Sequence, residues 1–374
     1  MVRNVFLRLK FLCALSFVLG SFFITSCSKE TDEFEDQKEV TADDESDIAS
    51  ERDVWSFDVK VMLDRATYKL YFSDADIVKK KLQERFDDVA VLYKGKNGIN
   101  FFDADIKFNP IFDESNVYDS SSEDVFVNGL TYRGDYPYLL IIDGCIGDYA
   151  GERVHSDWTG WGQEIVCLFD NGLSAADDGK TVYDILSKYK TSEAITHELG
   201  HARGVPDIYA MEVKTNPICY LIFSPVKCIM NVCWGGDSWS EYAQLLINRN
   251  KDLVRGEPGF CPLEEPPFPE TLTLKMLKGE QPISNAKVNI YGSVMYSYTV
   301  EDNSVSSYTT DEDGCIQLNP ESLFTGTNGD YKYGVVLLEI VRSEEKYYDF
   351  LPVYEVQIPY LKEAKDNIQL NIVI

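Results

Sequence analysis

Apolar residues follow two different periods in the central part of the chain, and they predict a fold that mixes helices with strands. Residues 57–63 alternate between apolar and polar positions, which is typical of a strand with one buried face. Residues 138–142 and 164–169 are nearly continuous apolar runs, which suit strands buried on both faces. Residues 75–92 and 238–252 carry apolar side chains at helical spacing and predict two amphipathic helices.

The C-terminal part of the chain shows only short alternating runs, which predict an all-β domain. The runs lie at residues 271–277, 286–291, 334–341, 354–358 and 367–373. Residues 311–314, Asp-Glu-Asp-Gly, are typical of a tight turn between strands. About seven strands in so short a segment favour a small sandwich. The proline-rich residues 263–269 that precede them predict a hinge.

Charge and hydropathy divide the N-terminal region into two segments. Residues 1–27 begin with basic residues and then run apolar, which is the pattern of an export signal rather than a permanent membrane span. Residues 28–53 hold 12 acidic and 3 basic residues and predict a disordered tether. The whole chain of 374 residues has a formal net charge of −27, so nucleic acid and anionic lipid surfaces are poor partners.

One short segment, His-Glu-Leu-Gly-His-Ala-Arg-Gly-Val-Pro-Asp, holds two of the three histidines in the chain. His197 and His201 are four residues apart, so a helix places both on one face. Two imidazoles so placed can bind one Zn²⁺, which leaves Glu198 to act on a water molecule. Gly204 suits the left-handed position after a helix, and Pro206 prevents the helix from continuing.

Two residues are candidates for the third zinc ligand. A sharp turn after the helix can bring Asp207 back toward the metal, and a carboxylate oxygen is an accepted zinc ligand. His155, the remaining histidine, lies upstream and is the competing candidate. Thr191 or Ser192 is the expected N-cap of the helix.

The segment resembles the metzincin metallopeptidase motif, His-Glu-x-x-His-x-x-Gly-x-x-His followed by a methionine turn. The matching residues are His197, Glu198, His201 and Gly204. Asp207 stands where most metzincins have the last histidine, and this substitution is similar to the snapalysin-type branch.

The resemblance also implies roles for residues outside the motif. Met230 matches the methionine of the methionine turn, which lies beneath the zinc site as a hydrophobic floor. Val232 stands where astacins and serralysins have a tyrosine, so no tyrosine is expected to assist from that position. In metzincins the strand before the active helix lies at the sheet edge and pairs with substrate, which points to residues 164–169.

Residues 24–27, Ile-Thr-Ser-Cys, resemble the bacterial lipobox. In that family the signal is removed before the cysteine, so Cys27 would carry the lipid anchor. The acidic residues that follow resemble an export signal of outer-membrane lipoproteins. The implied location is the outer membrane of a Gram-negative bacterium, facing the periplasm or the cell surface. Export also permits disulfides, and Cys219 with Cys228 would close a short loop.

The C-terminal part resembles transthyretin-like or carboxypeptidase-regulatory-like modules at residues 282–288 and 310–314. The expected fold is an α+β metzincin-like peptidase domain, with a mixed sheet and an active-site helix, followed by an all-β immunoglobulin-like sandwich. The predicted segments are signal peptide 1–27, acidic tether 28–53, peptidase domain 54–262, hinge 263–269 and β-sandwich 270–374.

These observations predict a lipid-anchored, extracytoplasmic zinc endopeptidase. His197, His201 and Asp207 would hold Zn²⁺, which activates a water molecule, and Glu198 would serve as general base. The expected partners are a protein or peptide substrate and the membrane, through Cys27. An alternative from another class stays open: a catalytically idle surface lipoprotein that binds protein or glycan through its β-sandwich.

Overall fold

The computed structural model describes most of the chain from residue 52 onward. The described residues are 52–65, 68–72, 74–94, 102–119, 134–143, 152–159, 163–170, 189–231, 238–262, 266–326, 329 and 331–374. The expected signal peptide with Cys27, and all but the last two residues of the expected tether, lie outside them. Val232 and the side chain of His155 also lie outside them.

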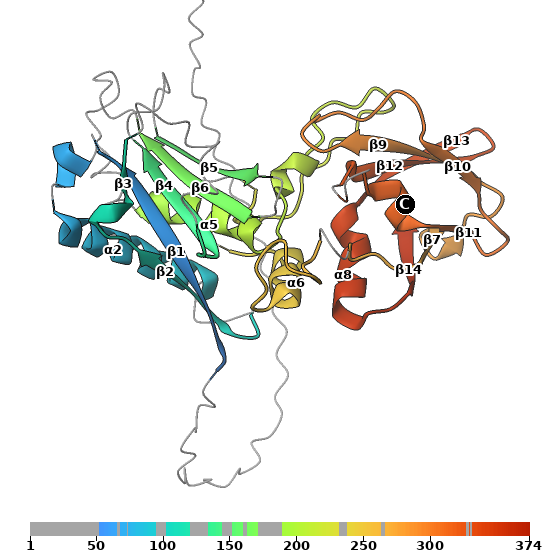
Figure 1. Ribbon diagram of the computed structural model, residues 1–374. Coiled ribbons are helices and arrows are strands. Elements are labelled where there is room, and N and C mark those ends of the chain that lie inside the picture. The colour runs from blue at the N-terminus through green and yellow to red at the C-terminus, as the bar shows by residue number, and fades with distance from the viewer. Residues whose placement is uncertain are drawn as a thin grey trace, which may run out of the picture. The chain divides into compact units, whose positions relative to one another are not determined.

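The first sheet is mixed and has six strands. They are β1 (Val54–Asp64), β2 (Asp105–Ile111), β3 (Val117–Tyr118), β4 (Tyr138–Asp143), β5 (Glu152–Thr159) and β6 (Gln163–Asp170). Their spatial order is β2-β1-β4-β6-β5, with β3 paired beside β1 (Figure 1). Every pairing is parallel except that of β5 with β6, so β5 is an antiparallel edge strand.

The expected strands at 57–63, 138–142 and 164–169 are confirmed as parts of β1, β4 and β6. The expectation that 164–169 lies at the sheet edge is wrong, because β6 is paired on both sides. Its continuous apolar run suits an interior strand. The largely polar sequence of β5 suits a strand at the edge of the sheet.

Two helices pack against this sheet and against each other. Helix α2 (Ala75–Lys94), which confirms the helix predicted at 75–92, contacts β2. Helix α5 (Tyr189–Ala202) contacts β5, β6 and α2 (Figure 1). One face of α2 is buried through Val78, Leu82, Phe86 and Val89. Ile77, although apolar, is exposed, and the neighbouring Val78 is buried.

The C-terminal region holds two further sheets of four strands each. Their strands are β7 (Thr271–Lys278), β8 (Gln281–Pro282), β9 (Lys287–Val294), β10 (Ser306–Thr309), β11 (Cys315–Leu318), β12 (Tyr333–Arg342), β13 (Glu345–Pro352) and β14 (Asn367–Val373). One sheet has the order β10-β9-β12-β13, and the other has the order β11-β7-β14 with β8 beside β7. The turn predicted at 311–314 is present, and it connects the two sheets. We call residues 270–374 the β module.

The β module is not all-β, because two helices interrupt it. They are the short α7 (Pro320–Phe324) and the longer α8 (Val353–Glu363), which replaces the strand predicted at 354–358. The buried residues of α8 are Val353, Tyr354, Val356 and Gln357, a helical spacing. The apparent alternation arose because Gln357 is polar yet fully buried, where it accepts a hydrogen bond from Tyr242 (2.6 Å).

The β module contacts the preceding part of the chain through helix α6 and a short 3-10 helix. Helix α6 (Glu241–Asn250), capped by Ser240, confirms the helix expected at 238–252 and packs against α8. The 3-10 helix η4 (Ile208–Met211) packs against β12. Within the expected hinge, Phe268 is buried and its ring stacks on Phe324.

The remaining short helices within the described residues are the π-helix η1 (Tyr68–Phe72) and the 3-10 helix η3 (Glu114–Asn116). In the part of the chain that the structure describes, no helix combines the length and apolar character needed to cross a bilayer. Cys219 and Cys228 are both free, so the disulfide suggested for this pair is not formed.

Candidate metal centre

Helix α5 carries the first two candidate ligands and ends immediately after the second. Gly204 has a φ of +90°. Its N–H donates to the carbonyl of His201 (2.9 Å), and the N–H of Val205 donates to that of Gly200 (3.0 Å). These two bonds form a Schellman motif, so the prediction that Gly204 ends the helix is confirmed. A Cβ at this position would lie 2.4 Å from the carbonyl oxygen of Cys261, a contact that only glycine avoids.

The start of α5 differs from the prediction. The helix begins at Tyr189, so Thr191 and Ser192 both lie inside it and neither is its N-cap. The buried hydroxyl of Ser192 donates to Asp88 of α2 (3.1 Å), and Arg85 forms an ion pair with the same carboxylate oxygen (2.8 Å). This polar cluster fastens the beginning of the ligand-bearing helix to α2.

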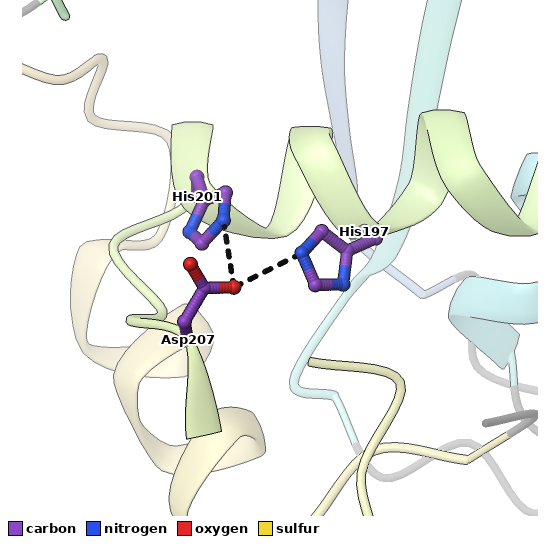
Figure 2. A group of neighbouring side chains, drawn as sticks. All are labelled: His197, His201 and Asp207. Atoms are coloured by element: carbon purple, nitrogen blue, oxygen red, sulfur yellow. Dashed lines mark hydrogen bonds and ion pairs between the residues drawn. The ribbon is translucent and has the colours of Figure 1, made fainter. Parts of the chain in front are cut away.

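The turn after α5 brings Asp207 back to the two histidines, as Figure 2 shows. Asp207 Oδ1 lies 3.1 Å from His197 Nε2 and 3.3 Å from His201 Nε2. One potential ligand atom from each residue lies within 4.8 Å of the other two. His197 and Asp207 are buried, whereas His201 is partly exposed. The structure therefore brings together the three residues predicted to bind the metal.

The Nδ1 atom of each imidazole is hydrogen-bonded to a backbone carbonyl. His197 Nδ1 lies 2.9 Å from the carbonyl oxygen of Ile229, and His201 Nδ1 lies 2.8 Å from that of Val205. A carbonyl oxygen can only accept, so each Nδ1 must carry the proton that is donated. In a neutral imidazole the Nε2 atom then presents a lone pair, which is the form that binds metals.

The same geometry tests whether the donor set fits a metal ion. Two Nε2 lone pairs and a carboxylate oxygen that face one another at these distances repel, unless a cation or additional protons lie among them. Ligand atoms on a tetrahedral Zn²⁺ lie about 3.3 Å apart, close to both observed separations. Two imidazoles and one carboxylate are a donor set that suits zinc. The residues present therefore fit a zinc ion.

Asp207 is held as a carboxylate by its neighbours. Burial alone would raise its pKa. In the metal-free protein, protons on the two Nε2 atoms let His197 and His201 donate hydrogen bonds to Oδ1, and these outweigh burial and hold the pKa of Asp207 well below its usual value. A bound cation would take the place of those protons. The second oxygen, Oδ2, accepts a hydrogen bond from the hydroxyl of Tyr296 in the β module (2.5 Å). Desolvation, followed by the charge of Asp207, raises the pKa of Tyr296, so this hydroxyl stays protonated and donates.

Met230 lies under the ligand-bearing helix. It is fully buried, and a Cβ added at Gly200 would lie 2.6 Å from its sulfur. The carbonyl of Met230 accepts from the N–H of Ile208, the residue after Asp207 (3.0 Å). The carbonyl of the preceding residue, Ile229, accepts the hydrogen bond from His197 Nδ1. The turn around Met230 is therefore bonded both to the first ligand and to the neighbour of the third.

Glu198 is buried on α5, with 4% of its surface exposed. Among the described residues, the cluster of potential metal ligands contains both histidines and Asp207 but not Glu198. Sequence reasoning did not find Tyr296 or the two carbonyls that hold the imidazoles. These contacts join residues 89, 32 and 4 positions apart and have no spacing signature.

Comparisons with known proteins do not identify a family. No family model matches the chain, and no curated protein matches it either. Among solved structures, it shows a weak similarity to a 9R-lipoxygenase from Cyanothece PCC8801. That match has a TM-score of 0.18 and 11% identity, and it covers 32% of this chain and 18% of the lipoxygenase. A similarity of this size carries no argument about fold or function.

Proposed function

We propose that this protein is a metzincin-like zinc endopeptidase. The observation that carries the proposal is the convergence of His197 Nε2, His201 Nε2 and Asp207 Oδ1, with the other polar atom of each side chain held by a separate partner. Outer hydrogen bonds of this kind orient metal ligands and raise their basicity. A mixed sheet packed on the ligand-bearing helix also supports the proposal, since the motif resemblance implies that arrangement.

Different residues around the centre would bind the metal and transfer the proton. A zinc ion bound there supplies a Lewis acid that polarises a peptide carbonyl and lowers the pKa of a water molecule toward about 7. His197, His201 and Asp207 would hold that ion. Glu198, next to His197, accepts the proton of the attacking water and returns it to the leaving amine. No nucleophilic side chain is required.

The edge of the first sheet supplies a place for an extended substrate. Among the residues that the structure describes, β5 is paired only with β6, and both strands contact α5. An edge strand can bind an extended peptide through backbone hydrogen bonds, whatever the side chains of that peptide. We propose that β5 aligns protein substrates across the centre in this way.

The proposed location rests on the N-terminal sequence. A basic and apolar segment at 1–27, ending in Ile-Thr-Ser-Cys, supports export and acylation at Cys27. We therefore place the peptidase outside the cytoplasm, anchored by lipid to the outer membrane. Its substrates are then proteins or peptides that reach the periplasm or the cell surface.

The test compares wild type with Glu198→Gln. Purified wild type should contain one zinc per chain and should cleave a denatured protein, and a chelator should abolish cleavage. Glutamine keeps the shape of Glu198 but cannot accept a proton, so the variant should retain zinc and lose roughly 10³-fold in activity or more. Zinc content without any cleavage by wild type would favour the idle binding protein. Near wild-type turnover by zinc-loaded Glu198→Gln would remove Glu198 from the role of base.

A further inference from the structure

The third candidate ligand is shared between two parts of the fold. Asp207 comes from the segment after α5, yet its Oδ2 atom accepts a hydrogen bond from Tyr296, which follows β9 in the β module. Its Oδ1 atom faces both imidazoles. One oxygen of the carboxylate therefore points to the candidate metal position, while the other is held by the β module.

The backbone around Tyr296 holds it in an unusual conformation. The N–H of Ser297 donates to the carbonyl of Val294 (3.0 Å), which closes a four-residue turn, and Tyr296 is its third residue with a φ of +66°. Glycine or asparagine normally occupies the third position of a turn that has positive φ there. A bulky residue in this region is an outlier that the surrounding structure must stabilise.

Contacts that stabilise Tyr296 come from Asp207 and the residues that follow it. The N–H of Tyr296 donates to the carbonyl of Ala210 (2.8 Å). The ring of Tyr296 meets that of Tyr209 edge to face, with centroids 5.9 Å apart. The strained turn is thus fastened through its backbone, its ring and its hydroxyl to residues 207–210.

The attachment extends beyond this turn on both sides. The N–H groups of Lys214 and Thr215 donate to the carbonyl of Tyr298 (2.9 and 3.1 Å), and Thr215 pairs with Thr299 as a β-bridge. Gly334 of β12 packs so closely on Met211 that a Cβ would lie 2.8 Å from its Cγ. The segment that carries the third ligand is therefore docked on the β module along its length.

We infer that Tyr296 is a positioning residue for Asp207, and that the β module contributes to the metal centre by orienting this ligand. By holding Oδ2, Tyr296 restricts Asp207 to binding a metal through Oδ1 alone. Because one contact orients the ligand and docks the module, metal binding and module docking stabilise each other. The inference rests on the metal site of the proposed function, but not on its peptidase activity.

The experiment measures zinc affinity in the full chain by competition with a chromophoric chelator. Tyr296→Phe removes the hydroxyl and keeps the ring and the backbone bond to Ala210. Tyr298→Phe is the matched control, because Tyr298 lies in the same loop with a similar φ of +57° and its ring covers Lys214. Loss of an outer hydrogen bond to a ligand should weaken zinc binding about 10-fold or more in Tyr296→Phe. Tyr298→Phe should bind as wild type does.

Cobalt substitution separates positioning from a general effect on folding. A carboxylate released by Tyr296→Phe can bind Co²⁺ through both oxygens, which raises the coordination number and changes the position and intensity of the visible d–d bands. A merely structural contact leaves the cobalt spectrum unchanged. The apo forms of both variants should still unfold in one cooperative transition, with Tyr296→Phe at a somewhat lower temperature because it lacks the hydrogen bond to Asp207.

The outcomes distinguish this inference from the proposed function. Weaker zinc binding with an altered cobalt spectrum in Tyr296→Phe alone supports the inference, even if no variant cleaves protein. Wild-type affinity and spectrum in Tyr296→Phe overturn it and leave the proposed function intact. Failure of wild type itself to bind zinc or cobalt overturns both.

Discussion

The contact between Met230 and Gly200 makes an unusual prediction, namely that Gly200→Ala destabilises the protein although it improves helix propensity. In a helix interior this substitution ordinarily stabilises by about 1 kcal/mol. Here the new Cβ would lie 2.6 Å from Met230 Sδ and 3.0 Å from Trp239 Cη2. A distance below 3.0 Å is not tolerated, so Met230 must move, and Trp239 is already in close contact.

Neither neighbour has much room. Met230 is fully buried, and its carbonyl is bonded to Ile208. Trp239 donates its indole N–H to the carbonyl of Leu92 (3.2 Å) and packs against Tyr93, with ring centroids 4.9 Å apart. Overpacking of a filled core costs about 1–3 kcal/mol. Because neither side chain can move freely, we expect a cost at the upper end of that range, and subtracting the gain in propensity leaves a net loss of about 2 kcal/mol.

The assay is denaturant unfolding of the apo protein, with a chelator present so that metal does not contribute. Gly200→Ala should shift the midpoint to lower denaturant with an unchanged slope. Adding Met230→Ala removes the closest contact, so the double variant should lose less than the two single losses combined. Gly200→Ala should also weaken zinc binding, since movement of Met230 disturbs the adjacent Ile229 carbonyl that holds His197. A midpoint that rises in Gly200→Ala would refute this packing around the centre.

Two further predictions concern other parts of the chain. In the β module, burial acts to raise the pKa of Glu339, but hydrogen bonds from Lys346, Asn289 and Tyr291 lower it to about 2. Glu339 thus stabilises the fold above its unfolded pKa of about 4.5 and loses this effect as pH falls toward 2. Glu339→Gln should cost about 1–3 kcal/mol at pH 7, and the difference from wild type in urea unfolding should shrink below pH 4.5. Cys27→Ala should abolish labelling by a fatty-acid probe and release the protein from the membrane fraction, whereas retention after a salt wash would contradict the lipobox assignment.

The local features of the centre could be predicted because they depend on short-range geometry. The four-residue spacing of His197 and His201 determines that they share a helical face, and Gly204 meets a backbone requirement that few residues satisfy. Strands β1, β4 and β6 of the first sheet were also predicted, from their apolar runs, whereas β2, β3 and β5 were not. The order of the strands in the sheet could not be predicted, and residues 164–169 were therefore wrongly expected at the sheet edge.

The unpredicted features depend on contacts between distant residues. Nothing in the sequence around Tyr296 indicates that its hydroxyl reaches Asp207, because the approach is set by docking of the β module. Residues 354–358 were mistaken for a strand because a buried Gln357 was read as an exposed one. In both cases a polar group is buried against a specific partner, which a pattern of apolar and polar positions does not record.

Metal content after dialysis tests the central claim most directly. Wild type, Asp207→Ala and His155→Ala are loaded with zinc, dialysed at equal protein concentration and measured by atomic spectrometry. If His197, His201 and Asp207 form the centre, wild type and His155→Ala retain one zinc per chain and Asp207→Ala retains almost none. Full zinc occupancy in Asp207→Ala, with loss in His155→Ala, would contradict the account.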